Sequence, residues 1–152
     1  MAKRLAVVGA VAALVALALS TVVQAAADDD QHRTVRVRSV NVEEKFLDLN
    51  GRGPSLGDDF VFSSNLWRNG QRVGRAGVSC TVTSLRHQEF QCLGTVRLGN
   101  GQITIQGLLA DEPELFAFPV TGGSGAYTGA DGVLHVRQVS ERTEILTFDL
   151  EL

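Results

Sequence analysis

The chain has 152 residues, of which 20% are charged and 44% are hydrophobic, with 16 glycines and only 3 prolines. That length suits one domain, and this composition is typical of a globular protein and excludes a disordered one. The formal net charge is −3, and it becomes −5 if the first 25 residues are removed, because Lys3 and Arg4 leave with them. Lys45 is then the only lysine, and a negative domain without a basic cluster is not expected to bind nucleic acid or an anionic membrane.

The first 25 residues have the pattern of a secretory signal peptide. Lys3 and Arg4 give a positive start, residues 5–23 are uncharged, and Val23-Gln24-Ala25 provides small residues for cleavage. The alternative is an uncleaved membrane anchor, because the uncharged run is nearly long enough to span a bilayer. The alanine-rich run and the cleavage site favour secretion, with no stable membrane insertion after processing. A disordered leader is expected at residues 26–33.

From residue 34 onward, short runs alternate apolar and polar side chains, and no helical period is present. In the first run the alternation slips between Val37 and Val40, which suggests a β-bulge. Asn69-Gly70 is a strong hairpin signal, and the glycines of the next run suggest bends at barrel corners. The pattern predicts strands at residues 34–42, 46–49, 59–67, 71–84, 89–98, 102–109, 115–121, 132–139 and 143–152.

Eight or nine consecutive short strands close most simply into an antiparallel barrel, because closure leaves no strand edge unpaired. The predicted fold class is therefore all-β, a closed antiparallel β-barrel of about eight strands at residues 34–152, preceded by the signal peptide. A β-sandwich is the alternative that the pattern alone leaves open. A barrel of about eight strands has room inside for side chains or for one small ligand.

Five glycines fall within residues 120–132, between two alternating runs. Their spacing differs from the dinucleotide fingerprint, no helical pattern follows, and the Walker lysine is missing, so no phosphate-binding cofactor is expected. Ser124 nearly fits a nucleophile elbow, but Ala126 stands where that motif needs glycine. We interpret the run as a structural turn that shapes a barrel corner, with the glycines Gly122, Gly123, Gly125 and Gly129.

The only two cysteines, Cys80 and Cys92, lie symmetrically about Arg86 in a predicted hairpin loop. That register places them opposite each other on one face, and export permits a disulfide between them. Two buried free thiols are the alternative. No metal site and no catalytic triad are predicted, because ligand or triad spacing is absent around the three histidines, His32, His87 and His135.

Several short motifs precede the glycine run in a fixed order. They are Gly57-Asp58, the tetrapeptide Ser-Asn-Leu-Trp at residues 64–67, Arg72-Val73-Gly74, Ala76-Gly77 and Gln106-Gly107. Together with Val-Thr-Gly-Gly-Ser-Gly-Ala-Tyr-Thr-Gly-Ala-Asp-Gly, they resemble the allene oxide cyclase and dirigent barrels from about residue 57 to the C-terminus. The resemblance implies an apolar cavity that folds a flexible unsaturated substrate, and it implies a homotrimer.

The resemblance also implies candidate ligand-binding residues, which are Phe62, Asn65, Val78, Phe90 and Leu109. Asn65 matches the asparagine of the Ser-Asn-Leu motif and is expected to face the interior; the alternative is an exposed residue beside the Asn69-Gly70 turn. Leu109 stands where the plant cyclases have a tyrosine, and residues 34–42 contain no carboxylate. No catalytic residue is therefore assigned.

We expect an exported barrel that binds an apolar small molecule and fixes its conformation for a cyclisation or a stereoselective coupling. Proximity and orientation can supply such catalysis with few ionisable groups, and whether this chain turns over a substrate is left open. The alternatives are a lipocalin-like binding protein without turnover and a structural exported barrel filled by side chains. An open apolar cavity would separate the first two functions from the third.

Export is directly testable. In a host that secretes the protein, mass spectrometry of the medium should find a mature N-terminus near Ala26, because the residues before it fit a cleavage site. Full-length protein confined to the membrane fraction would contradict cleavage and favour the anchor.

Overall fold

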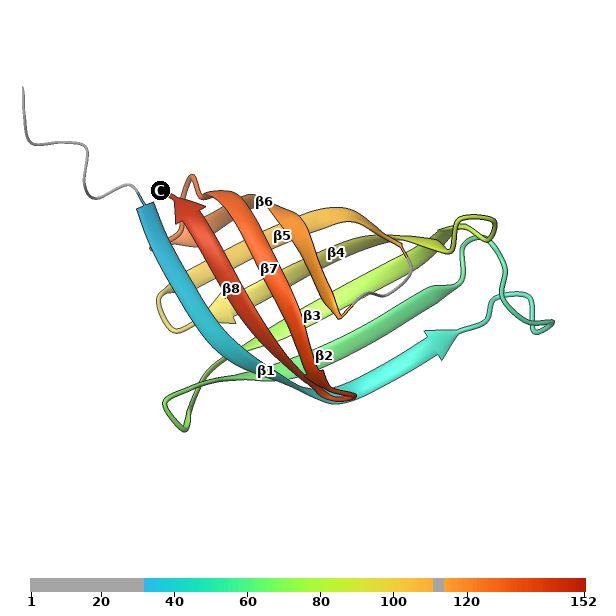
Figure 1. The fold of residues 1–152 in the computed structure, drawn as a ribbon, viewed down its shortest axis with the longest axis horizontal. Helices are drawn as coiled ribbons and strands as arrows, with labels where there is room; N and C mark the ends of the chain where they lie inside the picture. The colour runs from blue at the N-terminus through green and yellow to red at the C-terminus, as the bar shows by residue number, and fades with distance from the viewer. Residues whose placement is uncertain (1–31, 111–113) are drawn as a thin grey trace, which may run out of the picture.

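The computed structural model describes residues 32–110 and 114–152, which form a barrel of eight antiparallel strands (Figure 1). The strands are β1 (His32–Leu47), β2 (Asp59–Arg68), β3 (Gln71–Ser84), β4 (Glu89–Leu98), β5 (Gly101–Ala110), β6 (Leu115–Gly125), β7 (Asp131–Ser140) and β8 (Thr143–Glu151). Each strand pairs with its neighbours in sequence, and β1 also pairs with β8. The predicted closed barrel is confirmed and the sandwich is excluded.

The N-terminal predictions fall mostly outside this structure. The expected signal peptide at residues 1–25 lies outside the described residues, as does most of the expected leader. β1 begins at His32, so the last two residues of that leader belong to a strand. The run at residues 46–49, expected to continue as strand, does so as the end of β1, which runs without a break to Leu47 and stops two residues earlier than expected.

The alternation of β1 continues through the position where a slip was predicted. Val35, Val37 and Ser39 are all buried, and the pairing of β1 with β8 is regular from His32 to Val40. The bulge predicted between Val37 and Val40 is therefore wrong, and the register shift against β2 comes later, between residues 41 and 43. The apparent slip has a physical cause, because the inward positions change there from apolar to polar side chains.

Two turns show why glycine occurs where it does. Asn69 and Gly70 join β2 to β3 with φ of 51° and 76°, and two positive φ values are those of a type I′ hairpin turn. At the β6–β7 corner, a Cβ atom on Gly123 would lie 2.2 Å from the carbonyl oxygen of Tyr127. Any larger side chain would push this corner away from the barrel.

The β6–β7 corner closes one end of the barrel. Tyr127 of this corner is 2% exposed and belongs to the same buried core as Ile103, Phe148 and Leu150. The backbone N–H of Ala126 donates to the carbonyl of Asn100 at 2.9 Å, which ties the corner to the β4–β5 turn. Side chains fill this half of the barrel, so open space is confined to the other half.

A disulfide joins neighbouring strands inside the barrel. Cys80 of β3 and Cys92 of β4 are paired directly across the sheet, with their Cα atoms 4.0 Å apart, and both side chains are buried. The predicted cross-strand bond is present, and the alternative of two free thiols is excluded. The bond closes a short loop, for which the typical contribution to stability is about 2–3 kcal/mol.

Two aspartates organise the loop between β1 and β2. Asp48 accepts hydrogen bonds from the backbone N–H groups of Asn50, Gly51 and Gly53. Asp58, which is fully buried, accepts from the backbone N–H of Leu49 at 2.9 Å and from the N–H and hydroxyl of Ser55. The bond from Leu49 makes the largest contribution to lowering the pKa of Asp58 below its ordinary value.

The variant Asp58→Asn tests whether the charge of Asp58 stabilises this loop, through the pH dependence of stability. A carboxylate whose pKa is lowered by folding adds stability above its unfolded pKa, and that stability is lost as the pH falls through the folded pKa. We therefore expect the variant to have a lower Tm at pH 7 and the difference from the parent to shrink near pH 3. Thermal melts followed by circular dichroism measure this, with Glu151→Gln at the exposed end of β8 as the control. A Tm difference that stays constant with pH would contradict the role of the charge.

Candidate functional site

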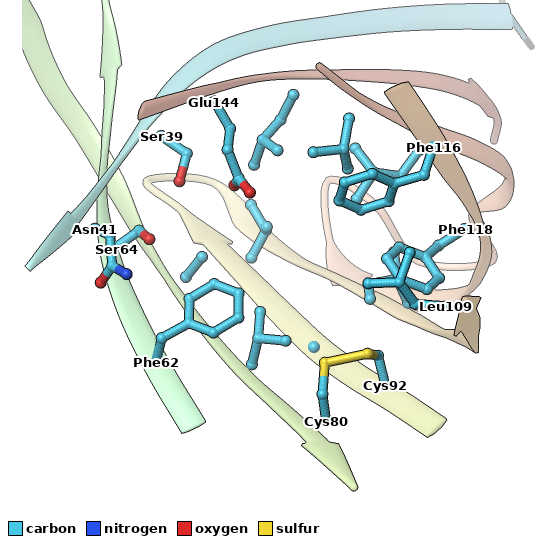
Figure 2. Close-up of a pocket in the computed structure, with 18 of the residues that line it drawn as sticks. Ser39, Asn41, Phe62, Ser64, Cys80, Cys92, Leu109, Phe116, Phe118 and Glu144 are labelled. Carbon is cyan, nitrogen blue, oxygen red and sulfur yellow. A yellow bond between two sulfur atoms is a disulfide. The ribbon is translucent and has the colours of Figure 1, made fainter. Parts of the chain in front are cut away.

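A cavity of about 280 Å³ occupies the half of the barrel away from the β6–β7 corner (Figure 2). All eight strands and the β7–β8 turn contribute side chains to its wall. Its volume is close to the lower limit of ordinary small-molecule pockets, about 300 Å³, so it suits a compact ligand. The barrel is therefore not filled by its own side chains.

Most of the wall is apolar and aromatic. Phe60 and Phe62 lie on β2 with ring centroids 5.6 Å apart, and Phe116 and Phe118 lie on β6, also 5.6 Å apart, in an edge-to-face arrangement. Strands β2 and β6 are four apart in the closed sheet, so the two ring pairs stand on opposite sides of the cavity. In Figure 2, Phe62 faces the Phe116 and Phe118 side, and the disulfide forms another part of the wall. A flat or folded apolar ligand would be held between these surfaces.

Polar side chains gather on one part of the wall. Ser39 of β1 is paired with Glu144 of β8, Asn41 of β1 with Ser64 of β2, and all four line the cavity. Figure 2 shows the Glu144 carboxylate and the Ser39 hydroxyl side by side, pointing into the open space. Gln138 of β7 is paired with Glu144 from the other side and also lines the cavity. The pocket thus combines apolar walls with a small set of convergent polar groups, as binding sites commonly do.

Glu144 is the ionisable group inside this polar set. It has the same phase as Leu146, Phe148 and Leu150, which are all buried on the inner face of β8. Burial raises the pKa of the Glu144 carboxyl above its ordinary value. Across residues 32–110 and 114–152, its carboxylate makes no hydrogen bond or ion pair, so its bonding capacity is available to a ligand.

Sequence reasoning missed Glu144 because it sought a carboxylate on the first strand. The signal was present nevertheless, as a glutamate in phase with the apolar residues of the last strand. In a strand with one buried face, that phase places a charge inside the barrel.

Asn41 offers a second unsatisfied group. Its Nδ2 donates to the Glu44 carboxylate, but its Oδ1 is buried and has no hydrogen-bond partner in the part of the chain that the structure describes. Leaving such an acceptor unpaired costs about 1–3 kcal/mol. A water or a ligand N–H or O–H could satisfy it.

The structure brings four of the five predicted ligand-binding residues together. Phe62, Val78, Phe90 and Leu109 all line the cavity, and their contact with a ligand stays a prediction. Asn65 does not line it, so its expected inward orientation is wrong. Asn65 is half-buried on the outer face, paired with Val40 and Arg75.

The reason for the error at Asn65 is the alternation of β2. Successive side chains point to opposite faces, and a shift of one residue exchanges the two sets. The neighbours Ser64 and Leu66 are 2% and 0% exposed and occupy the inner face. Ser64 thus provides the polar group of this strand inside the cavity.

The mouth of the cavity is charged. Glu44, Glu141 and Arg142 are exposed and line its rim near the β7–β8 turn. Within the described ranges, no three His, Cys, Asp or Glu side chains are grouped in a way that could hold a metal ion. The same residues form no helix that is long and apolar enough to cross a bilayer.

Comparison with known proteins adds three similar structures. A pyocyanin demethylase matches with a TM-score of 0.70 and 27% identity, covering 78% of this chain and 99% of its own. A pterocarpan synthase dirigent protein matches with a TM-score of 0.62 and 14% identity, covering 80% of this chain and 94% of its own. The Diels–Alderase AbmU from Streptomyces koyangensis matches with a TM-score of 0.60 and 12% identity, covering 78% of this chain and 64% of its own. The last two similarities show the shared fold.

No curated protein sequence matches this chain significantly. A family model does, and it is described as the allene oxide cyclase barrel-like domain. The match spans residues 21–150, which includes all eight strands of the barrel except Glu151, the last residue of β8. On that match and on its closed eight-stranded barrel, the chain belongs to the allene oxide cyclase barrel-like family.

Proposed function

We propose that this protein binds a compact, mainly apolar small molecule in the barrel and fixes its conformation for a ring closure or a stereoselective coupling. The observation that carries the proposal is the open cavity, with aromatic side chains on opposite walls and polar groups gathered on one part of the wall. Holding reacting atoms close together and aligned can lower the activation barrier by about 7–11 kcal/mol without a covalent intermediate between substrate and protein. A cavity shaped by five phenylalanines can impose such a fold on a flexible ligand.

The polar part of the wall gives the cavity its chemistry. A group with a raised pKa can hold or release a proton nearer to neutral pH, which suits general acid–base catalysis. Glu144 has such a pKa, and it is paired across the sheet with the Ser39 hydroxyl. We assign to Glu144 the stabilisation of charge that develops on the bound molecule, and to Ser39 and Ser64 the orientation of its polar end.

The structural neighbours support this class of reaction. Their names include a Diels–Alderase and a pterocarpan synthase dirigent protein. A demethylase that acts on pyocyanin is also among them, at higher identity. These neighbours and the present chain share the barrel, and the cavity is where such substrates would be accommodated.

Binding without turnover is the second candidate function. It is favoured by the scarcity of ionisable groups inside the cavity, where the described lining residues include no histidine, lysine or cysteine thiol. Analysis of products after incubation with polyenes and epoxides distinguishes the two, because a lipocalin-like protein would return its ligand unchanged. A purely structural barrel is disfavoured by the open volume.

We also propose that the protein is exported. The disulfide supports this, because such bonds persist in oxidising compartments. The signal-like sequence at residues 1–25 supports it independently.

Val78→Phe tests the cavity as the binding site. The added ring would occupy open volume, so the affinity for a neutral aromatic probe, N-phenyl-1-naphthylamine, should fall at least about tenfold, or about 1.4 kcal/mol. Fluorescence titration measures this, and the control is Asn65→Leu on the outer face of β2. Equal affinities for the parent and a folded Val78→Phe variant would place binding elsewhere.

A homotrimer is a further proposal that follows from the family resemblance. Leu93, Leu108 and Leu115 lie on β4, β5 and β6 and are 56%, 58% and 66% exposed, an apolar surface that association could cover. Multi-angle light scattering at micromolar concentration should give three times the chain mass, and Leu93→Glu with Leu108→Glu should lower it. A monomeric parent protein would contradict the proposal.

A further inference from the structure

We propose that the cavity takes a neutral or cationic ligand and rejects anionic ones, and that Glu144 is the residue that sets this selectivity. The inference rests on the proposed function, since it concerns what the same cavity binds. The ligand class is an aromatic or polyene compound with an amine, N–H or hydroxyl group near one end. Carboxylates and sulfonates of the same shape are excluded.

The first observation is the balance of charge around the cavity. Three carboxylates line it, from Glu44, Glu141 and Glu144, against a single basic side chain, Arg142. Arg142 is exposed at the rim and forms no ion pair with these glutamates in the described part of the chain. The field at the mouth and inside therefore disfavours an entering anion.

The second observation is the environment of Glu144 in the deeper part of the cavity. Among the described residues that line the deeper part of the cavity, Glu144 is the charged group, beside the uncharged polar side chains of Ser39 and Ser64, and most of the remaining wall is apolar. An anionic group placed in this space would lose its water and face a carboxylate, with no cation to pair with. Removing an unpaired charge from water is unfavourable, and a second like charge adds to the cost.

The third observation is that the polar wall is rich in acceptors. Asn41 Oδ1 is buried and unpaired, and the Glu144 carboxylate has no partner within the described residues. Both would accept from a ligand N–H or O–H. Aromatic faces around them also attract a cation, so the five phenylalanines add to the same preference.

Two probes with one ring system separate charge from shape. N-phenyl-1-naphthylamine is neutral, and 8-anilino-1-naphthalenesulfonate is the same skeleton with a sulfonate. In titrations of the processed protein at pH 8, the affinity for the neutral probe should be at least about tenfold higher than the affinity for the sulfonate. Competition between the probes, and their shared loss of affinity in Val78→Phe, shows that both occupy the cavity.

Glu144→Gln tests the residue itself, because it removes the charge at nearly constant volume. In the folded variant, the sulfonate should gain at least about threefold in affinity relative to the neutral probe, since both probes carry the same N–H and differ only in the sulfonate. Glu151→Gln, on the exposed end of β8, should leave both affinities unchanged. Melting curves confirm that each variant is folded.

Arg142→Gln is a second variant at an exposed turn position, and it serves if Glu144→Gln does not fold. It should weaken the sulfonate by about twofold to fivefold and leave the neutral probe unaffected. Equal binding of the two probes by the parent protein would overturn the inference and leave the cavity function standing. An unchanged affinity ratio in the folded Glu144→Gln variant would overturn the role of Glu144. Failure of both probes to bind would overturn the proposed function and this inference with it.

Discussion

The pairing of β1 with β8 is the constraint on which the rest of this molecule depends. Nine residue pairs, from His32 with Glu151 to Val40 with Thr143, join the first and last strands into one closed sheet. Closure decides which face of every strand is interior, because successive side chains along each strand point to opposite faces of the sheet. The same pairing places Ser39 beside Glu144, so one set of backbone hydrogen bonds both closes the barrel and assembles the polar part of the cavity.

Closure leaves an interior that the protein divides into two halves. At one end the β6–β7 corner inserts Tyr127, and large side chains such as Phe148 fill the space around it. At the other end the space stays open, and packing lost there must be offset elsewhere. The filled end and the disulfide beside the cavity provide that support, since they hold the wall without occupying the space. The packed core and the cavity are thus separated along the barrel axis.

The wall of the cavity is mainly apolar and carries few charged groups. Here the carboxylate inside the cavity comes from the last strand, while the first strand contributes the hydroxyl of Ser39 and the amide of Asn41. A closed sheet makes this arrangement possible, because its first and last strands are neighbours. Side chains from both strands therefore reach the same part of the cavity. The resulting wall carries hydrogen-bond acceptors, and among the described residues Asn41 Oδ1 is buried without a donor.

Local signals in the sequence determined much of the fold. Alternation with period two marked the strands, Asn69-Gly70 marked a hairpin, and the symmetry of Cys80 and Cys92 about a turn gave the disulfide register. Each is a property of residues close together in the chain. The orientation of Asn65 was decided only by tertiary structure, because β2 has apolar residues on both faces and its own sequence does not say which one is inside. The phase of the last strand was enough to place Glu144 on the inner face, but its position beside Ser39 was decided only by the pairing of β8 with β1, which neither segment shows alone.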